Sequence, residues 1–214
     1  MKVAILGSGH VGQALGVGFA KEGHDVKLGT RAPHDDKITQ WLKRAGPTAS
    51  AGTFAQAAAW GDLAVLATRW DGTENAIKLA DPKNLAGKVV IDVTNPLKSV
   101  PSAPPGLAVG HTDSGGEQVQ RWLPKAKVVK AFNIVNTAHM YKPQFPGGPP
   151  DMFICGNDAG AKQTVTEICA AFGWPVTDIG GIEGARLLEP LAMLYVLYAI
   201  QSGKWDLAWK LLKK

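Results

Sequence analysis

Short apolar segments alternate with helix-like segments along most of the chain, and this alternation limits the possible folds more than any other feature. Strands are expected at Lys2–Leu6, Asp25–Thr30, Asp62–Thr68, Lys88–Val93, Lys127–Phe132, Asp151–Cys155 and Pro175–Ile179. Helices are expected between them at Val11–Glu22, Lys37–Ala45, Thr53–Ala59, Asp71–Ala80, Gly115–Leu123 and Ala159–Phe172. Repeated strand–helix units favour a parallel sheet covered by helices on both faces. The predicted class is therefore α/β, with a Rossmann-type doubly wound, mainly parallel sheet.

The pattern changes near the end of the chain. Ala185–Gln201 and Lys204–Leu212 are predicted to be two helices with no strand between them. We therefore expect a Rossmann domain over residues 1–180 and a helical extension over residues 181–214. The first of these helices carries large apolar residues around nearly its whole surface, so it must be buried. Either the parent sheet alone covers it, or a second subunit does; we expect a dimerisation segment that forms a homodimer.

Two proline-rich regions are expected to lack regular structure. Asn95–Pro105 is predicted to be a loop, and Asn136–Gly148 is predicted to be irregular. Proline has no backbone N–H and a fixed φ, so it interrupts both helices and central strands. These regions therefore separate the strand–helix units without adding strands to the sheet.

Length and composition exclude several classes of protein. A chain of 214 residues suits one α/β domain with a helical appendage, and a hydrophobic content of 45% is too high for a disordered protein. The net charge is only +5, with no long basic stretch, so a nucleic-acid partner is not expected. The apolar stretch Leu187–Ile200 is interrupted by Glu189 and Pro190 and is shorter than the roughly 20 residues that span a bilayer, so no membrane association is expected.

The two cysteines, Cys155 and Cys169, cannot form a disulfide framework or a four-thiolate metal site. Both lie among apolar residues, as buried reduced thiols of a cytoplasmic protein do. The residues at the start of the chain are interrupted by glycine too early for a signal peptide. We expect a cytoplasmic protein without a metal site.

A Gly-x-Gly-x-x-Gly motif follows the first predicted strand and opens the first predicted helix. Its residues are Gly7, Ser8, Gly9, His10, Val11 and Gly12. Gly7 permits a sharp turn, Gly9 lets a pyrophosphate approach the backbone, and Gly12 allows the helix to pack close to the strand. The helix N-terminus offers N–H groups and a partial positive charge to phosphates. His10 is expected to contribute through its backbone. A dinucleotide site is predicted, in preference to a purely structural glycine turn.

The end of the second strand selects the cofactor. An NAD-binding protein places a carboxylate there for the ribose hydroxyls. This chain has Thr30 and Arg31 instead, and its first acid is Asp35. A threonine hydroxyl and an arginine fork are suited to the 2′-phosphate of NADP. The sequence therefore predicts NADP; a solvated turn with an exposed arginine is the alternative.

Ligands of doubly wound sheets lie beyond the carboxyl ends of the strands. The residues predicted to lie there, beside the nicotinamide, are Thr68, Arg69 and Trp70 after one strand, Asn95, Pro96 and Leu97 after the next, and Asn133 after a third. Trp70 and Leu97 could contact a flat ring, and the two asparagines could orient it by hydrogen bonds. Packing of the loops alone is the alternative.

No catalytic acid, base or nucleophile stands out, since Gly-x-Ser-x-Gly, His-Glu-x-x-His and Cys-x-x-Cys motifs are all missing from the sequence. Hydride transfer between two flat redox molecules needs positioning and exclusion of water, whereas alcohol oxidation needs a proton acceptor. The sequence therefore favours hydride transfer between cofactors, and no catalytic residue is assigned.

Several stretches resemble the coenzyme F420-dependent NADP oxidoreductases, including their bacterial dinucleotide-binding branch, and the reductase domain of the STEAP metalloreductases. They are Ala4–Gly12, Leu28–Arg31, Asp62–Trp70, Val90–Leu97, Val128–Asn133 and Ala185–Leu191. The resemblance implies reversible hydride transfer between NADPH and a deazaflavin (coenzyme F420) or a flavin (FMN or FAD). It also implies a dimer formed by the C-terminal helical part.

Carried over by this resemblance, the segment 7–12 binds the pyrophosphate, Thr30 and Arg31 hold the 2′-phosphate, and Thr68, Trp70, Asn95 and Pro96 approach the nicotinamide. The archaeal deazaflavin enzymes are expected to have a histidine where this chain has Asn133, so the second substrate stays open. A non-catalytic NADP-sensing module and a small-substrate NADPH-dependent reductase are the alternative functions.

Overall fold

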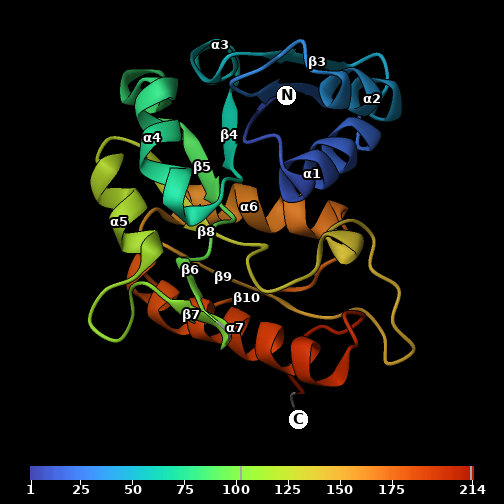
Figure 1. Cartoon of the computed structure of the whole chain (residues 1–214), viewed down its shortest axis with the longest axis vertical. Helices are drawn as coiled ribbons and strands as arrows, with labels where there is room; N and C mark the ends of the chain where they lie inside the picture. Colours follow the sequence, from blue (N-terminus) through green and yellow to red (C-terminus); the bar gives the residue numbers. More distant parts are fainter. Residues whose placement is uncertain (102, 213) are drawn as a thin grey trace.

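The computed structural model describes residues 1–101, 103–212 and 214, and its centre is an eight-stranded sheet (Figure 1). The strands are β1 (Lys2–Leu6), β2 (Asp25–Gly29), β3 (Ala49–Gly52), β4 (Leu63–Leu66), β5 (Val89–Asp92), β8 (Lys127–Lys130), β9 (Met152–Gly156) and β10 (Val176–Asp178). Their order is β10-β9-β8-β5-β4-β1-β2-β3. Every pair is parallel except β8–β9. The predicted doubly wound, mainly parallel sheet is confirmed.

Helices cover both faces of the sheet. They are α1 (His10–Lys21), α2 (Asp36–Ala45), α3 (Phe54–Trp60), α4 (Trp70–Ala80), α5 (Gly115–Trp122), α6 (Ala159–Ala171) and α7 (Ala185–Ser202), with 3-10 turns at Pro82–Leu85, Thr137–His139 and Ile182–Gly184. Helices α1, α2 and α6 share one apolar core, and α3, α4 and α5 share the other. The alternation along β1 explains this, because Val3 and Ile5 point into the first core whereas Ala4 and Leu6 point into the second.

The order of the strands places a topological switch point next to β1. Strand β1 pairs with β2 on one side and with β4 on the other, so the connections diverge between β1 and β4. Ligands of open α/β sheets bind at such a switch point, beyond the carboxyl ends of the strands. The loop after β1 therefore opens at the centre of this edge.

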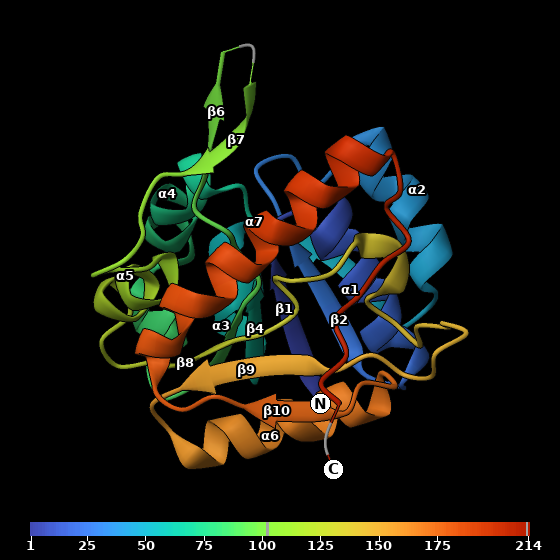
Figure 2. The same ribbon diagram turned by 90° about the horizontal axis from the view of Figure 1, so that it is seen from below.

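The structure corrects the prediction of a loop over Asn95–Pro105. The segment forms an antiparallel hairpin of β6 (Leu97–Val100) and β7 (Ala103–Leu107), which stands clear of the rest of the molecule in Figure 2. Its prolines are tolerated because the hairpin is an isolated two-stranded ribbon, in which each strand has an edge without ladder hydrogen bonds. The short strand β3 also went unpredicted, since its small residues carry no strand-like pattern.

The prediction of a second helix at Lys204–Leu212 is wrong. Helix α7 ends at Ser202 and is followed by Gly203, whose φ of 69° is left-handed, and the chain then continues without regular structure. The N–H of Asp151 donates to the Trp209 carbonyl at 2.8 Å, and the Trp209 side chain packs against the core. The segment after α7 thus bonds to the residues before β9 and does not form the helix that the spacing of its apolar residues predicted.

Helix α7 is only partly covered within one chain. Leu188, Ala192 and Ala199 are buried, whereas Leu187, Leu194, Tyr198 and Ile200 are 69%, 54%, 54% and 45% exposed. Packing on the parent sheet therefore leaves an apolar face of α7 in solvent. Among the residues that the structure describes, none of the helices combines the length and the apolar content needed to cross a bilayer.

Candidate cofactor site

The glycine motif folds as the sequence requires. Gly7 has a φ of +129°, and a side chain there would collide with the carbonyl of Ala67, the residue directly after β4. A side chain on Gly12 would collide with the Gly7 carbonyl, so the first turn of α1 can pass close to β1 only with glycine at that position. At Gly9, by contrast, an added Cβ meets nothing within 4 Å. The backbone is thus closely packed at Gly7 and Gly12, whereas the space next to Gly9 is free for a ligand.

The N-terminus of α1 keeps the partial positive charge of its free backbone N–H groups. Its N-cap is Gly9, which offers no capping side chain, and the first turn contains no acidic residue. The Ser8 hydroxyl, the nearest candidate cap, instead pairs with the Thr30 hydroxyl at 3.0 Å. Backbone N–H groups of a helix without a cap need external acceptors, and phosphate oxygens are suitable ones. A dinucleotide pyrophosphate fits this loop.

Two cations border the site beyond β2. Thr30 is buried, and its hydroxyl also lies 3.4 Å from the Ala32 N–H. Arg31 is exposed beside it, and Lys37, in the first turn of α2, faces the same cavity. Asp35 caps α2 by accepting from the Lys37 N–H at 2.8 Å. Sequence reasoning missed Lys37, although its place as the first residue of a predicted helix close after Arg31 was a usable signal.

At the end of β4, Thr68, Arg69 and Trp70 all line the cavity. The Thr68 hydroxyl bonds to the Thr73 hydroxyl at 2.9 Å, which orients it from the first turn of α4. The Trp70 ring stacks on Trp122 of α5, with 5.5 Å between ring centroids. One face of the indole is therefore used for packing, and Trp70 is firmly held at the edge of the cavity.

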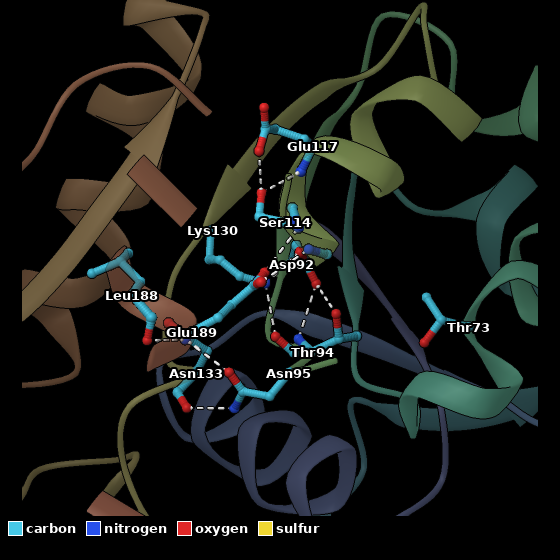
Figure 3. Close-up of polar contacts among 12 residues, drawn as sticks. Thr73, Asp92, Thr94, Asn95, Ser114, Glu117, Lys130, Asn133, Leu188 and Glu189 are labelled. Carbon is cyan, nitrogen blue, oxygen red and sulfur yellow. Dashed lines mark hydrogen bonds and ion pairs between the residues drawn. The ribbon is translucent and has the colours of Figure 1, made fainter. Parts of the chain in front are cut away.

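At the end of β5 the predicted residues divide into two groups. Asn95 and Leu97 line the cavity, whereas Asn133 lies behind them (Figure 3). The Asn133 amide donates to Asn95 Oδ1 at 3.0 Å and to the Leu188 carbonyl at 3.1 Å, and Asn95 donates back to the Asn133 carbonyl at 2.8 Å. Asn133 thus positions Asn95 and ties it to α7. Pro96 is also buried and does not line the cavity.

One cavity of about 1270 Å³ brings most of these residues together. The predicted residues that line it are Gly7, Ser8, Gly9, His10, Val11, Thr30, Arg31, Thr68, Arg69, Trp70, Asn95 and Leu97. Gly12, Pro96 and Asn133 lie behind this surface. All of its lining among the described residues falls between residues 7 and 105. The sheet order arranges the lining in a row, from β2 through β1 and β4 to β5 and the hairpin.

A buried ionic cluster underlies the β5 end of the cavity. The Lys130 ammonium lies 2.8 Å from Asp92 Oδ2 and 3.0 Å from Glu189 Oε1, and it donates to the Thr94 carbonyl at 2.8 Å (Figure 3). The three charged side chains are at most 1% exposed. Burial alone would lower the pKa of Lys130, but the two carboxylates outweigh it and hold that pKa above its ordinary value.

The Glu189 carboxylate also holds a helix. It accepts the Gly115 and Gly116 N–H groups at 2.9 Å each, so α7 supplies the acceptor for the N-terminus of α5. Gly116 has space for no side chain, because a Cβ there would lie 2.7 Å from the Ala185 Cβ. The cluster joins β5, β8, α5 and α7 behind the cavity. The only hint of this cluster in the sequence is Glu189 itself, an acid within an otherwise apolar stretch.

Comparisons with known proteins identify the family. The family model described as "NADP oxidoreductase coenzyme F420-dependent" matches residues 2–96. The F420-dependent NADP reductase of Methanocaldococcus jannaschii is 30% identical over 206 residues, which cover 92% of this chain and 91% of that protein. The chain belongs to the F420-dependent NADP oxidoreductase family.

Two further proteins are similar to this chain. A crystal structure from Arthrobacter sp. FB24, itself assigned to the F420-dependent NADP reductases by inference, matches with a TM-score of 0.93, 36% identity and complete coverage of both chains. The metalloreductase STEAP3 of Rattus norvegicus is 32% identical over 200 residues, 90% of this chain. The chain spans only 37% of the length of that metalloreductase. The resemblance to both branches is thereby confirmed.

Proposed function

We propose that the protein is an NADP(H)-dependent oxidoreductase that transfers a hydride between NADPH and a flat redox molecule, either the deazaflavin coenzyme F420 or a flavin such as FMN or FAD. The observation that carries this proposal is the single cavity along the carboxyl edge of the sheet. It places two cations beyond β2, an open glycine loop after β1 and polar side chains after β4 and β5.

The chain's own residues have distinct roles in this proposal. Arg31 and Lys37 bind the 2′-phosphate together with the Thr30 hydroxyl, because a guanidinium and an ammonium beside a hydroxyl satisfy its three oxygens. The amides at the start of α1 bind the pyrophosphate. The first carboxylate after β2 is Asp35, which lines the cavity but is engaged as the cap of α2 by the Lys37 N–H, and the residues directly at the strand end are Thr30 and Arg31. NADPH is therefore preferred over NADH.

At the other end, Thr68 and Asn95 orient the nicotinamide, and Leu97 and Trp70 shield it from water. When bound, NADPH supplies the hydride. The protein contributes position and a dry surface, which account for catalysis without a protein acid or base. The buried charges of Lys130, Asp92 and Glu189 face one another behind the cavity, as befits a structural cluster.

The names of the relatives support the redox chemistry, since one acts with F420 and NADP and the other is a metalloreductase. We further propose the cytoplasm as the compartment, where NADPH is available and both cysteines, which are free and buried, stay reduced.

Calorimetric titration with NADPH and NADH tests the binding step, and stopped-flow oxidation of NADPH by F420, FMN and FAD tests the reaction. Arg31→Asp should weaken NADPH binding by about tenfold or more, because a charge-assisted contact of about 1.5–3 kcal/mol becomes a repulsion. Lys43→Asp, at the far end of α2, is the matched control and should leave NADPH binding unchanged. No heat with either nucleotide contradicts the cofactor assignment; binding without oxidation by any acceptor contradicts the reaction.

We also propose that residues 181–214 form a homodimer contact. The exposed apolar residues Leu187, Leu194 and Tyr198 of α7 support this, because such a row is rarely left in solvent. Light scattering should give twice the chain mass, and Leu194→Glu should reduce it to one chain. A wild-type protein that scatters as a monomer refutes the proposal.

A further inference from the structure

The hairpin β6–β7 carries a cation to the end of the cavity that lies farthest from Arg31. Leu97, Lys98, Ser99 and Pro105 of the hairpin all line the cavity. The hairpin begins two residues after Asn95, and its base is fixed because the Ala108 N–H donates to the Pro96 carbonyl at 2.6 Å. Along the carboxyl edge, Lys98 therefore follows the proposed nicotinamide position.

The surroundings of Lys98 leave its charge available. In the register of the hairpin Lys98 stands opposite Gly106, and the Lys98 Cε lies 3.8 Å from where a Cβ on Gly106 would be. The Lys98 stem therefore lies beside Gly106 of the neighbouring strand, and the side chain is exposed. Within the described part of the chain Lys98 takes part in none of the ion pairs.

The other charges of the cavity have partners or assigned roles. Arg31 and Lys37 lie at the opposite end, and Arg69 forms an exposed ion pair of 3.1 Å with Asp71. NADPH carries its phosphates toward β1 and β2 in the proposed orientation, and its nicotinamide end carries no negative charge. A cation beyond that end is therefore matched to a different molecule.

We propose that Lys98 recognises an anionic group, a phosphate or a carboxylate, on the second redox substrate. The inference rests on the proposed function and deepens it: Lys98 contacts the negatively charged side chain that F420, FMN and FAD have in common. Lys98 is then a specificity-determining residue. Because the contact is near the surface, it contributes modestly to affinity and weakens with salt.

The test compares ligands with and without an anionic side-chain group; FMN and riboflavin differ only in the phosphate, and F420 differs from its core in the whole anionic side chain. Binding of FMN and riboflavin, and of F420 and its phosphate-free deazariboflavin core, is measured by fluorescence with saturating NADP⁺. Binding is used so that the result does not depend on hydride transfer. We expect the phosphorylated member of a pair to bind up to about fivefold more tightly at low salt, and the difference to shrink in 0.5 M salt, since a single exposed charge contact is worth up to about 1 kcal/mol.

Lys98→Gln should weaken binding of the phosphorylated ligand about fivefold and leave the neutral one within about twofold, as expected for one exposed charge contact. Lys125→Gln is the matched control: Lys125 is exposed and precedes β8, at the amino edge of the sheet opposite the cavity, and should change neither. Calorimetry shows whether each variant still binds NADPH, which tests the cofactor assignment separately. The inference is overturned if the wild type shows no phosphate preference in either pair, or if Lys98→Gln weakens both members equally.

Discussion

Substitution of Glu189 should strongly lower the free energy of unfolding, although Glu189 does not line the cavity. Its carboxylate is 1% exposed and accepts three hydrogen bonds, from Gly115, Gly116 and Lys130. Glu189→Ala removes the acceptor of two buried N–H groups and leaves Lys130 with a single carboxylate. Removal of one partner from a buried ion pair costs about 3–5 kcal/mol, a large share of the roughly 5–15 kcal/mol that stabilises a typical domain.

The measurement is urea unfolding followed by tryptophan fluorescence, with the change read from the midpoint at constant slope. Glu74→Ala is the matched control: Glu74 pairs with Lys78 on the exposed face of α4, at 2.7 Å, and its loss should cost below about 0.5 kcal/mol. The double variant Lys130→Met/Glu189→Ala should lose less than the sum of its single variants, because each single variant already removes the Lys130–Glu189 contact and the sum counts it twice. A loss below about 1 kcal/mol in Glu189→Ala would refute the reasoning, since it would mean that the cluster contributes no net stability.

Three further predictions concern the loop, an ion pair and the thiols. Gly9→Ala should keep the stability of the wild type and weaken NADPH binding in calorimetry, whereas Gly12→Ala should also lower the urea midpoint, because only the second side chain meets backbone; equal midpoints for the two variants would contradict this. A hydrogen bond from its arginine partner lowers the pKa of Asp113 to about 2, so its stabilisation is present above pH 4 and is lost as the pH falls toward 2. Asp113→Asn should lose correspondingly less stability than the wild type between pH 4 and pH 2, by about 1 kcal/mol or less for a partly exposed pair. Burial raises the pKa of Cys155 to about 12 and also raises that of Cys169, so neither should react with a thiol reagent at pH 8 unless urea is added; fast reaction of the native protein would refute their burial.

The sheet and the phosphate loop were predictable because local pattern determines them. Strand β1 is an apolar run that ends in glycine, and the structure places Gly7 at a φ that other residues avoid. The order of strands and helices then follows from right-handed crossovers. Residues directly after β2, β4 and β5 were expected at the carboxyl edge, and the cavity contains most of them.

What sequence reasoning missed depends on contacts between distant segments. Lys130 looks like one polar residue at a strand end, and its burial becomes visible only when Asp92 and Glu189 are brought to it. Asn133 does not itself line the cavity, because its amide donates to Asn95 Oδ1 and to the Leu188 carbonyl of α7. The wrong prediction of a helix after Gly203 also results from a long-range contact. Trp209 packs against the core and its carbonyl accepts a hydrogen bond from Asp151, before β9.

The confinement of the cavity lining to residues 7–105 gives the molecule a modular character. Its second half supports the cavity from behind, while the hairpin alone adds surface at the far end. On the proposed assignment of Lys98, a different residue at this position of the hairpin would therefore alter the preference for an anionic redox partner. Diversification within the family could proceed through this short ribbon without any change in the glycine loop.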